Sequence, residues 1–304
     1  MSLTIYKIKR WVKMLSGNSI DHVNQDLGKC FDIDSIKGYY NNLTEKVTKN
    51  PSLLDSDALP KIHTESHGDI DFPIAIFQYG LGAYDLFLIE RDNRYLKKFL
   101  QCAEWAINSI DSCGRWNNFF FYSPQAPYSA MAQGEGTSLL LRAYKHTCDN
   151  RYLDASKKAV DFMLKSVKNG GGTTLYNGSN AYLMEYTFKG MVLNGAIFAW
   201  WGLYDFVKAT EDNSRYKEAL DNTLLTLINI LPKFSCRYWS MYSLDGLIAS
   251  PFYHRLHIAQ MDAMYCITHW DIFKEYASIW RRQQCSTLCT AHAFVRKSLQ
   301  KILE

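Results

Sequence analysis

The sequence predicts an all-α protein, an α/α toroid of about four helical hairpins. Three observations support this fold class. The pentapeptide DNRYL occurs twice, at residues 92–96 and 149–153, a spacing of 57 positions. Each copy lies between a mainly apolar helical stretch and an amphipathic one. Two blurred copies of the same unit follow, at residues 191–231 and 256–280.

Each unit predicts an inner helix, a short turn and an outer helix. The first helix is apolar on most of its surface and rich in glycine, which favours burial; the glycines are Gly80, Gly82, Gly134, Gly136 and Gly195. The second helix is one-sided, with Lys, Glu and Asp on an exposed face. Asp and Asn in the turn can cap the helix that follows. An open α-solenoid would use the same units, but polar and aromatic loops before the inner helices favour a ring.

The first 65 residues do not share this pattern. They mix short alternating stretches with turn residues, so we expect an irregular capping segment that can include a short β-hairpin. The predicted organisation is therefore a capping segment at residues 1–65 and a toroid domain at residues 66–304.

The bulk composition excludes several classes of protein. Hydrophobic residues make up 47% of the 304 residues and charged residues 21%, which is typical of a globular protein. The net charge of +4 comes without a Lys/Arg block, so no nucleic-acid partner is expected. The first residues do not resemble a secretory signal, and no apolar stretch reaches the length of a membrane span. These absences predict a cytoplasmic location and no membrane span.

The eight cysteines lack paired spacing, as expected of reduced thiols. Cys285, Cys289 and His292 fall on one helical face, but a zinc site needs a fourth ligand and tighter spacing. We therefore expect no metal site.

Inner helices that begin at one opening direct their N-terminal dipoles there, which favours an anionic ligand. The segments entering this opening carry many Tyr, His and carboxyl side chains. A glycosidase would need two carboxylic acids across a cleft. Glu185 and Glu135 are candidates for these acids, and Asp71 and Asp245 are further candidates for the partner acid. Proton abstraction next to a carboxylate would need a base and a donor on opposite faces. Composition alone does not decide between these reactions.

Four segments resemble the C-terminal domain of heparosan D-glucuronyl C5-epimerase. They are YSAMAQGEG at 128–136, EYTFKGMVLNGAIFAWWGLYD at 185–205, YSLDG at 242–246 and FYHRLHIAQM at 252–261. The resemblance runs in order from about Asn41 to Trp280. It implies a cofactor-independent epimerase with an α/α-toroid domain that inverts C5 of D-glucuronate to L-iduronate within a heparosan-like polysaccharide.

The resemblance also implies roles for individual residues. Tyr186 falls on the tyrosine of the family's Glu-Tyr-Pro stretch, with Glu185 before it, and Tyr242 and Tyr253 fall on two further essential tyrosines. These four are the predicted catalytic residues. The predicted substrate-binding residues are Tyr128, Gln133, Glu135, Asn194, Tyr238, His254, Arg255, His257 and Gln260.

Two positions depart from the family pattern. Thr187 replaces a proline, and Asp245 replaces an arginine that would neutralise the uronate carboxylate. Arg255 is a possible substitute for this arginine, and Tyr238 is the rival of Tyr242 as the second tyrosine. The expected partners are an acidic polysaccharide and, from the family, a second copy in a homodimer. The alternatives are a polysaccharide lyase acting on uronate polymers and a non-catalytic uronan-binding protein.

Overall fold

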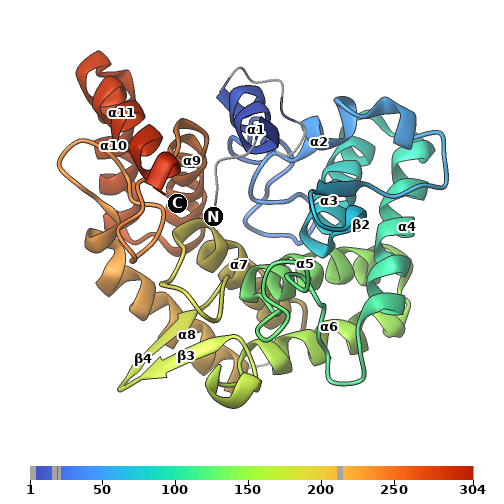
Figure 1. Cartoon of the computed structure of the whole chain (residues 1–304). Coiled ribbons are helices and arrows are strands. Elements are labelled where there is room, and N and C mark those ends of the chain that lie inside the picture. The colour runs from blue at the N-terminus through green and yellow to red at the C-terminus, as the bar shows by residue number, and fades with distance from the viewer. Residues whose placement is uncertain (1–4, 16–18, 20–21, 211–214, 304) are drawn as a thin grey trace.

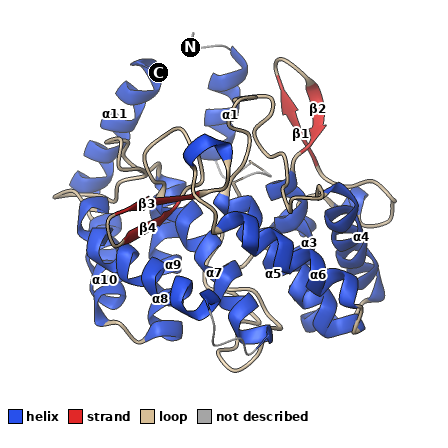
Figure 2. Cartoon of the chain, turned by 90° about the horizontal axis from the view of Figure 1, so that it is seen from below, coloured by secondary structure: helices blue, strands red, loops and turns tan. Residues whose placement is uncertain are grey.

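The computed structural model describes residues 5–15, 19, 22–210 and 215–303. They form a mainly helical body with two short β-hairpins (Figures 1 and 2). The helices are α1 (Ile5–Leu15), α2 (Thr44–Thr48), α3 (Pro73–Glu90), α4 (Asn93–Ser109), α5 (Ala130–Thr147), α6 (Asn150–Met163), α7 (Leu193–Thr210), α8 (Arg215–Ile230), α9 (Pro251–Thr268), α10 (Asp271–Cys285) and α11 (Thr287–Leu303). Short 3₁₀ turns cover Pro51–Leu53, Lys168–Gly170 and Leu231–Phe234. The strands are β1 (Lys61–Thr64), β2 (Gly68–Asp71), β3 (Thr174–Asn177) and β4 (Asn180–Leu183).

The predicted hairpins are the pairs α3–α4, α5–α6, α7–α8 and α9–α10. Figure 1 shows them following one another round the molecule, with α4, α6, α8 and α10 on the outside. The inner helices are buried along most of their length. The predicted α/α toroid is therefore confirmed. We call the end where the inner helices begin the mouth, and the end where they finish the far end.

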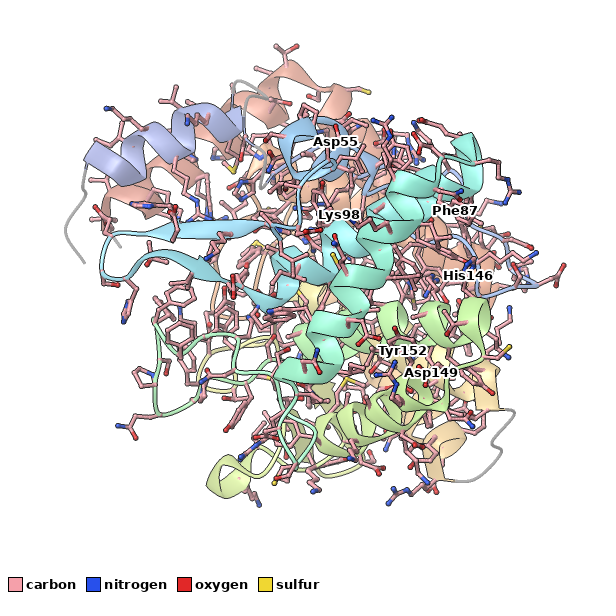
Figure 3. All side chains as sticks on the ribbon, turned by 90° about the vertical axis from the view of Figure 1, so that its right-hand side faces the viewer. Asp55, Phe87, Lys98, His146, Asp149 and Tyr152 are labelled. Carbon is pink, nitrogen blue, oxygen red and sulfur yellow. The ribbon has the colours of Figure 1, made fainter. Side chains whose placement is uncertain are left out.

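The repeated pentapeptide forms the same turn in both copies. The Asp92 and Asp149 carboxylates each accept the backbone N–H two residues on, and so cap α4 and α6. The residues just before them, Arg91 and Cys148, both adopt the left-handed conformation at φ 60°. Figure 3 views the side of the molecule that carries α4 and α6, and it shows Asp149 there. The corresponding turn of the third unit, at residues 211–214, lies outside the described residues.

Glycines allow the inner helices to pack closely, as the sequence predicts. A Cβ atom on Gly134 of α5 would lie 2.5 Å from the Ala199 Cα atom of α7. Gly202 of α7 lies against the Gly134 backbone in return. Larger residues at either position would push the two helices apart, so this contact fixes how α5 and α7 converge on the mouth.

The N-terminal segment occupies the space between the last inner helix and the first. Figure 1 shows α1 and α2 between α9 and α3, and α2 packs on α3 while α1 contacts α9. Tyr39 and Leu43 of this segment are fully buried, and the Tyr40 ring stacks on Trp201 of α7 at 4.8 Å. Lys98 of α4 donates to the carbonyls of Ser56 and Ala58. The segment is thus part of the core, and the domain boundary at residue 65 stays a prediction.

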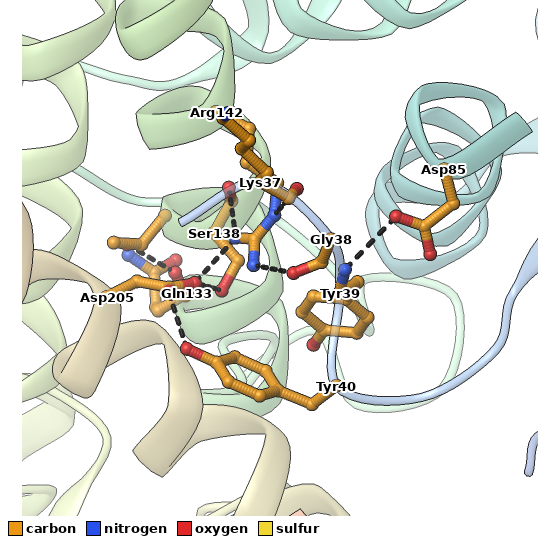
Figure 4. A network of polar contacts seen from close by, with 10 residues as sticks. Lys37, Gly38, Tyr39, Tyr40, Asp85, Gln133, Ser138, Arg142 and Asp205 are labelled. Atoms are coloured by element: carbon orange, nitrogen blue, oxygen red, sulfur yellow. Dashed lines mark hydrogen bonds and ion pairs between the residues drawn. The ribbon is translucent and has the colours of Figure 1, made fainter. Parts of the chain in front are cut away.

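A buried polar network joins this segment to the inner helices at the far end (Figure 4). Arg142 of α5 and Asp205 of α7 form an ion pair of 2.6 Å with both side chains buried. Asp205 also accepts the Tyr40 hydroxyl at 2.6 Å, and Arg142 donates to the Gly38 carbonyl at 2.9 Å. Asp85 of α3 accepts the Tyr39 N–H at 3.1 Å. The network therefore ties the far ends of α3, α5 and α7 to the N-terminal segment.

Two antiparallel hairpins flank the ring. β1 and β2 pair with Lys61 opposite Asp71, and β3 and β4 pair with Thr174 opposite Leu183. The first leads directly into α3 and crosses residue 65, whereas the expected hairpin lay within residues 1–65. Figure 2 shows it rising from the same side of the helical body as α1 and α11. Within the described ranges, none of the helices is long and apolar enough to cross a bilayer.

Candidate active site

The structure brings three of the predicted tyrosines together at the mouth. Tyr186 follows β4, Tyr242 lies in the loop before α9, and Tyr253 is in the first turn of α9. The Tyr242 and Tyr253 ring centroids are 4.8 Å apart, and the Tyr242 and Tyr186 hydroxyls make a hydrogen-bonding contact. All three side chains are partly exposed. The three residues, called the tyrosine cluster below, are therefore accessible from solvent and in mutual contact.

Two local features hold the cluster in place. The Leu193 N–H at the start of α7 donates to the Tyr242 carbonyl at 3.1 Å, which fixes the Tyr242 loop against an inner helix. The Ser250 hydroxyl accepts the Tyr253 N–H at 3.3 Å as the N-cap of α9. Both tyrosines are thus anchored by the beginnings of inner helices rather than by free loops.

Glu185 lies buried next to the cluster. Gly195 of α7 makes room for it, because a Cβ atom there would lie 2.3 Å from the Glu185 Oε2 atom. That oxygen has no hydrogen-bond partner among the residues that the structure describes. Burial raises the pKa of Glu185 to about 7, against the opposing effects of the Tyr186 hydroxyl and the Lys189 charge. Glu185 can therefore gain or lose a proton near neutral pH.

Burial, and not positive potential, has the largest effect on the pKa values of Tyr186 and Tyr242. It raises the pKa of Tyr186 and of Tyr242 well above the ordinary value, and the Glu185 charge raises both further. Both hydroxyls are consequently protonated at neutral pH. They suit donation of a proton, or its transfer through a hydrogen bond to Glu185.

Further polar side chains from the inner helices lie buried below the cluster. Glu135 of α5 accepts the Gln78 amide of α3 at 2.8 Å, and Gln260 of α9 donates to the Asn194 carbonyl of α7 at 3.2 Å. Each of Glu135, Asn194 and Gln260 retains a buried side-chain oxygen without a partner in the described part of the chain. Burial raises the pKa of Glu135 to about 8, and the Glu185 charge adds to this. These free acceptors fit a polar ligand or water.

Gln133 and Tyr128 have other surroundings. The Gln133 amide donates to the Gly114 and Ala159 carbonyls, at 2.6 and 3.1 Å, and its oxygen accepts a backbone N–H. Its hydrogen bonds are thus made to the protein itself. Tyr128 packs edge-on against Phe162 of outer helix α6 at 5.2 Å. These contacts indicate that Gln133 and Tyr128 stabilise the fold, and the proposed site does not include them.

His254 and His257 support the loop that carries Tyr242. The Ser240 hydroxyl lies 2.8 Å from His254 Nδ1 and 3.0 Å from His257 Nδ1. His254 Nε2 lies 3.0 Å from the Trp280 carbonyl, and its ring stacks on Trp239 at 3.6 Å. Burial lowers the pKa of His254 to about 4 and that of His257 well below its usual range. Both are neutral, and their main contacts are structural.

The structure separates the two candidates for the second tyrosine. Tyr238 stacks on His292 of α11 at 4.0 Å, and its hydroxyl accepts from Arg296 at 3.0 Å. It belongs to the packing of α11, whereas Tyr242 lies beside Tyr253. The motif that identifies Tyr242 therefore agrees with the geometry.

The structure also shows where Asp245 and its expected substitute, Arg255, lie. Asp245 is exposed, and its carboxylate accepts the Gly190 N–H at 2.7 Å. Arg255, the expected substitute for the missing arginine, is exposed on α9. It lies two residues after Tyr253, so the two side chains leave the helix roughly 200° apart. Arg255 therefore does not share the face of the helix that carries Tyr253.

Other residues near the cluster were not identified from the sequence. The Phe119 ring stacks on Tyr186 at 4.5 Å, and the His22 ring lies 6.1 Å from Tyr253. The ammonium groups of Lys189 and Lys297 lie 5.1 Å from the Tyr186 ring and 5.7 Å from the Tyr242 ring, respectively. Only Lys189 carries a sequence signal, because it follows Tyr186 by three residues in one loop.

The described residues include no group of three His, Cys, Asp or Glu side chains arranged to hold a metal ion. Cys285 and Cys289 are free thiols, and the His292 ring is stacked on Tyr238.

Comparison with solved structures supports the fold. The cellobiose 2-epimerase of Bacillus thermoamylovorans superposes with a TM-score of 0.54 at 11% identity, covering 86% of this chain and 78% of that one. The enzyme of Spirochaeta thermophila gives 0.51 at 9% identity, covering 92% and 86%. At such identities the likeness concerns the fold alone. The molecule therefore has the α/α-toroid architecture of these carbohydrate epimerases.

The sequence comparison is more specific. The family model for the D-glucuronyl C5-epimerase C-terminus matches residues 97–282, more than half of the chain, and the chain belongs to this family. It is 25% identical over 221 residues to the D-glucuronyl C5-epimerase of Caenorhabditis elegans, covering 64% of this chain and 36% of the worm protein. It is 28% identical over 211 residues to an uncharacterised protein of Methanocaldococcus jannaschii, covering 62% and 67%. The match thus spans about a third of the worm relative.

Proposed function

We propose that this protein is a carbohydrate epimerase that inverts C5 of D-glucuronate to L-iduronate within an acidic polysaccharide. The observation that carries the proposal is the meeting of Glu185 with the tyrosine cluster at one partly exposed site. Membership of the C5-epimerase family and the name of the worm relative support the same reaction.

The reaction needs a proton to leave one face of the sugar and return to the other. The C5–H bond breaks and its proton passes to a base. The electron pair is delocalised into the uronate carboxylate, which becomes an enediolate. A new C5–H bond then forms with a proton given from the opposite face, and the donor is left deprotonated until solvent restores it. No bond to a neighbouring sugar is broken, and no redox cofactor is consumed.

In our proposal Tyr186 and Glu185 act as one base. The Tyr186 hydroxyl is too weak an acid to be ionised at rest, because burial raises its pKa. Glu185 titrates near neutrality, so its carboxylate accepts the Tyr186 proton as Tyr186 takes the proton from C5. Tyr253, on α9, is the donor for the other face. Tyr242 contacts both partners and orients them.

The remaining expectations stay predictions. Helix N-termini at the mouth favour an anionic polymer, and the free oxygens of Glu135, Asn194 and Gln260 are the proposed sugar-binding groups. We also expect a cytoplasmic homodimer in which residues 66–304 act as the catalytic unit. Mass measurement in solution tests the dimer.

The proposal is tested by incubating the protein with heparosan and recording its NMR spectrum. We expect signals of iduronate to appear while the chain length stays constant. A lyase would instead produce an unsaturated, ultraviolet-absorbing chain end and shorter chains. Binding of heparosan without new signals would identify a non-catalytic uronan-binding protein. Either of these results would overturn the proposed reaction.

A further inference from the structure

A uronate at the tyrosine cluster needs a cation for its carboxylate, and neither residue considered from the sequence supplies one. Asp245 stands where a family arginine is expected and carries the opposite charge. Its carboxylate is instead bonded to the Gly190 N–H at 2.7 Å. Arg255 leaves α9 on another side from Tyr253. The Asp245 carboxylate holds a loop that does carry a cation, Lys189.

That loop places the Lys189 ammonium group among aromatic rings. Lys189 donates to the Tyr122 hydroxyl at 2.7 Å. Its nitrogen lies 4.7 Å from the Tyr122 ring centroid, 5.1 Å from that of Tyr186 and 5.6 Å from that of Phe188. Aromatic faces attract a cation without neutralising it. The charge is thus held in place beside a candidate catalytic ring and stays exposed to an incoming anion.

The loop is fixed on both sides of Lys189. Before it, the Tyr186 ring stacks on Phe119 at 4.5 Å with 19° between the ring planes. After it, the Gly190 N–H is bound by Asp245. A Cβ atom on Gly190 would lie 2.3 Å from the Asp245 carboxylate, so glycine permits this close contact. The acidic residue that seemed to oppose an anionic substrate therefore positions a cation.

The Lys189 charge also affects a proposed proton-transfer group, Glu185. It lowers the pKa of Glu185, against the effect of burial. Removal of the C5 proton adds negative charge to the substrate carboxylate, so a cation already in position stabilises the enediolate more than the starting uronate.

We propose that Lys189 binds the uronate carboxylate and that Asp245 is the residue that positions Lys189 through Gly190. This inference rests on the proposed function. It makes Lys189 the determinant that selects acidic sugars over neutral ones, a task that the family pattern gives to an arginine at another position.

The test uses the full chain and four proteins: the unchanged protein, Lys189→Met, Lys189→Arg and Lys274→Met. Lys274 is the matched control, because its nitrogen also lies over a tyrosine ring, that of Tyr265 at 5.3 Å, but towards the end of α9 that lies away from the mouth. Deuterium exchange at C5 of heparosan gives kcat and KM, and calorimetry gives the affinity for heparosan oligosaccharides. The same oligosaccharides with methyl-esterified carboxyl groups provide the neutral ligand.

We expect Lys189→Met to lower kcat/KM on heparosan about 100-fold or more. Lys189→Arg should stay within about 10-fold of the unchanged protein, and Lys274→Met should match it. Affinity for the methyl ester should not depend on Lys189. In Lys189→Met the acid limb of the kcat profile should move to higher pH, because the group that lowers the Glu185 pKa is gone. A purely structural role would not move this limb.

The outcomes separate this inference from the proposed reaction. Normal exchange by Lys189→Met, or an equal loss of affinity for acidic and esterified oligosaccharides, would overturn the role of Lys189 alone. The unchanged protein could bind heparosan in a way that depends on Lys189 and yet show no exchange. That result would support the role of Lys189 and overturn the proposed reaction. Neither binding nor exchange by the unchanged protein would overturn both.

Discussion

At the far end of the ring, buried Arg142 and Asp205 form an ion pair of 2.6 Å, whereas at the mouth one oxygen of buried Glu185 has no partner among the described residues. Arg142 and Asp205 lie on the inner helices α5 and α7, and Glu185 lies in the loop that leads into α7. A paired buried charge has its desolvation cost offset by its partner, while an unpaired carboxyl responds through a raised pKa. The difference indicates that the far end stabilises the ring and that the mouth is kept available for a ligand.

Substitutions at the mouth should break function with little effect on folding. We expect Glu185→Gln and Tyr253→Phe each to lower the rate of C5 exchange by about 10²–10⁴-fold, because each removes a group that transfers a proton. Exchange is measured on heparosan in heavy water. Tyr238→Phe is the control, since Tyr238 packs on α11. Full activity of both mouth variants would contradict the proposed roles.

Substitutions at the far end should do the reverse. Asp205→Ala leaves the Arg142 charge buried without its carboxylate, which should lower the free energy of unfolding by about 3–5 kcal/mol. Urea unfolding measures the loss. The double variant Arg142→Met with Asp205→Ala should recover part of it, because no charge is then left unpaired. A loss below about 1 kcal/mol in the single variant would show that the pair does not hold the far end together.

Asp85 lies at the far end, but burial raises its pKa as it does for the carboxyls of Glu135 and Glu185 at the mouth. It accepts one hydrogen bond, from Tyr39, and burial raises its pKa from 3.8 to about 7. The folded protein therefore binds this proton more tightly than the unfolded chain. The stabilising effect is present below about pH 4 and is lost as pH rises towards 7.

Asp85→Asn removes this titration. Relative to the unchanged protein, the variant should gain roughly 3–4 kcal/mol of stability between pH 4 and pH 8. Chemical denaturation at both pH values measures the gain, and the contributions of Glu135 and Glu185 cancel because both proteins contain them. A difference that does not change with pH would show that the Asp85 pKa is not raised.

The smallest expected effect concerns the repeated turn, which lies on neither polar network. Asp92→Ala and Asp149→Ala should each lower stability by about 1 kcal/mol through loss of an N-cap. The two losses should add, because the two caps bind different backbone N–H groups and share no partner. Asp154→Ala, an exposed substitution within α6, should change stability by less than about 0.5 kcal/mol. Equal effects at all three sites would contradict the capping role.

The repeat made the ring of hairpins predictable, because the same turn chemistry and the same alternation of buried and one-sided helices recur. The caps at Asp92 and Asp149 followed from the same pattern. Motif matches also identified the three tyrosines that the structure places in contact. Their proximity is set by inner helices that begin at the same end, which a sequence with a recognisable repeat can indicate.

Other features depended on contacts that no local pattern encodes. Residues 38–43 are buried against α3, α5 and α7 although their sequence has no helical period. Gln133 resembles a ligand-binding residue in its motif, yet its amide donates to the backbone carbonyls of Gly114 and Ala159. Asp245 was expected to repel a uronate and is instead bonded to a backbone N–H. Each outcome depends on where a distant segment of the chain lies.

The central claim is that the mouth of this ring moves a proton at C5 of a uronate. It is tested most directly by incubating heparosan with the protein in heavy water and following C5 by NMR. We expect deuterium at C5 in both glucuronate and iduronate units, with the polymer intact. Incorporation no faster than with Glu185→Gln would contradict it.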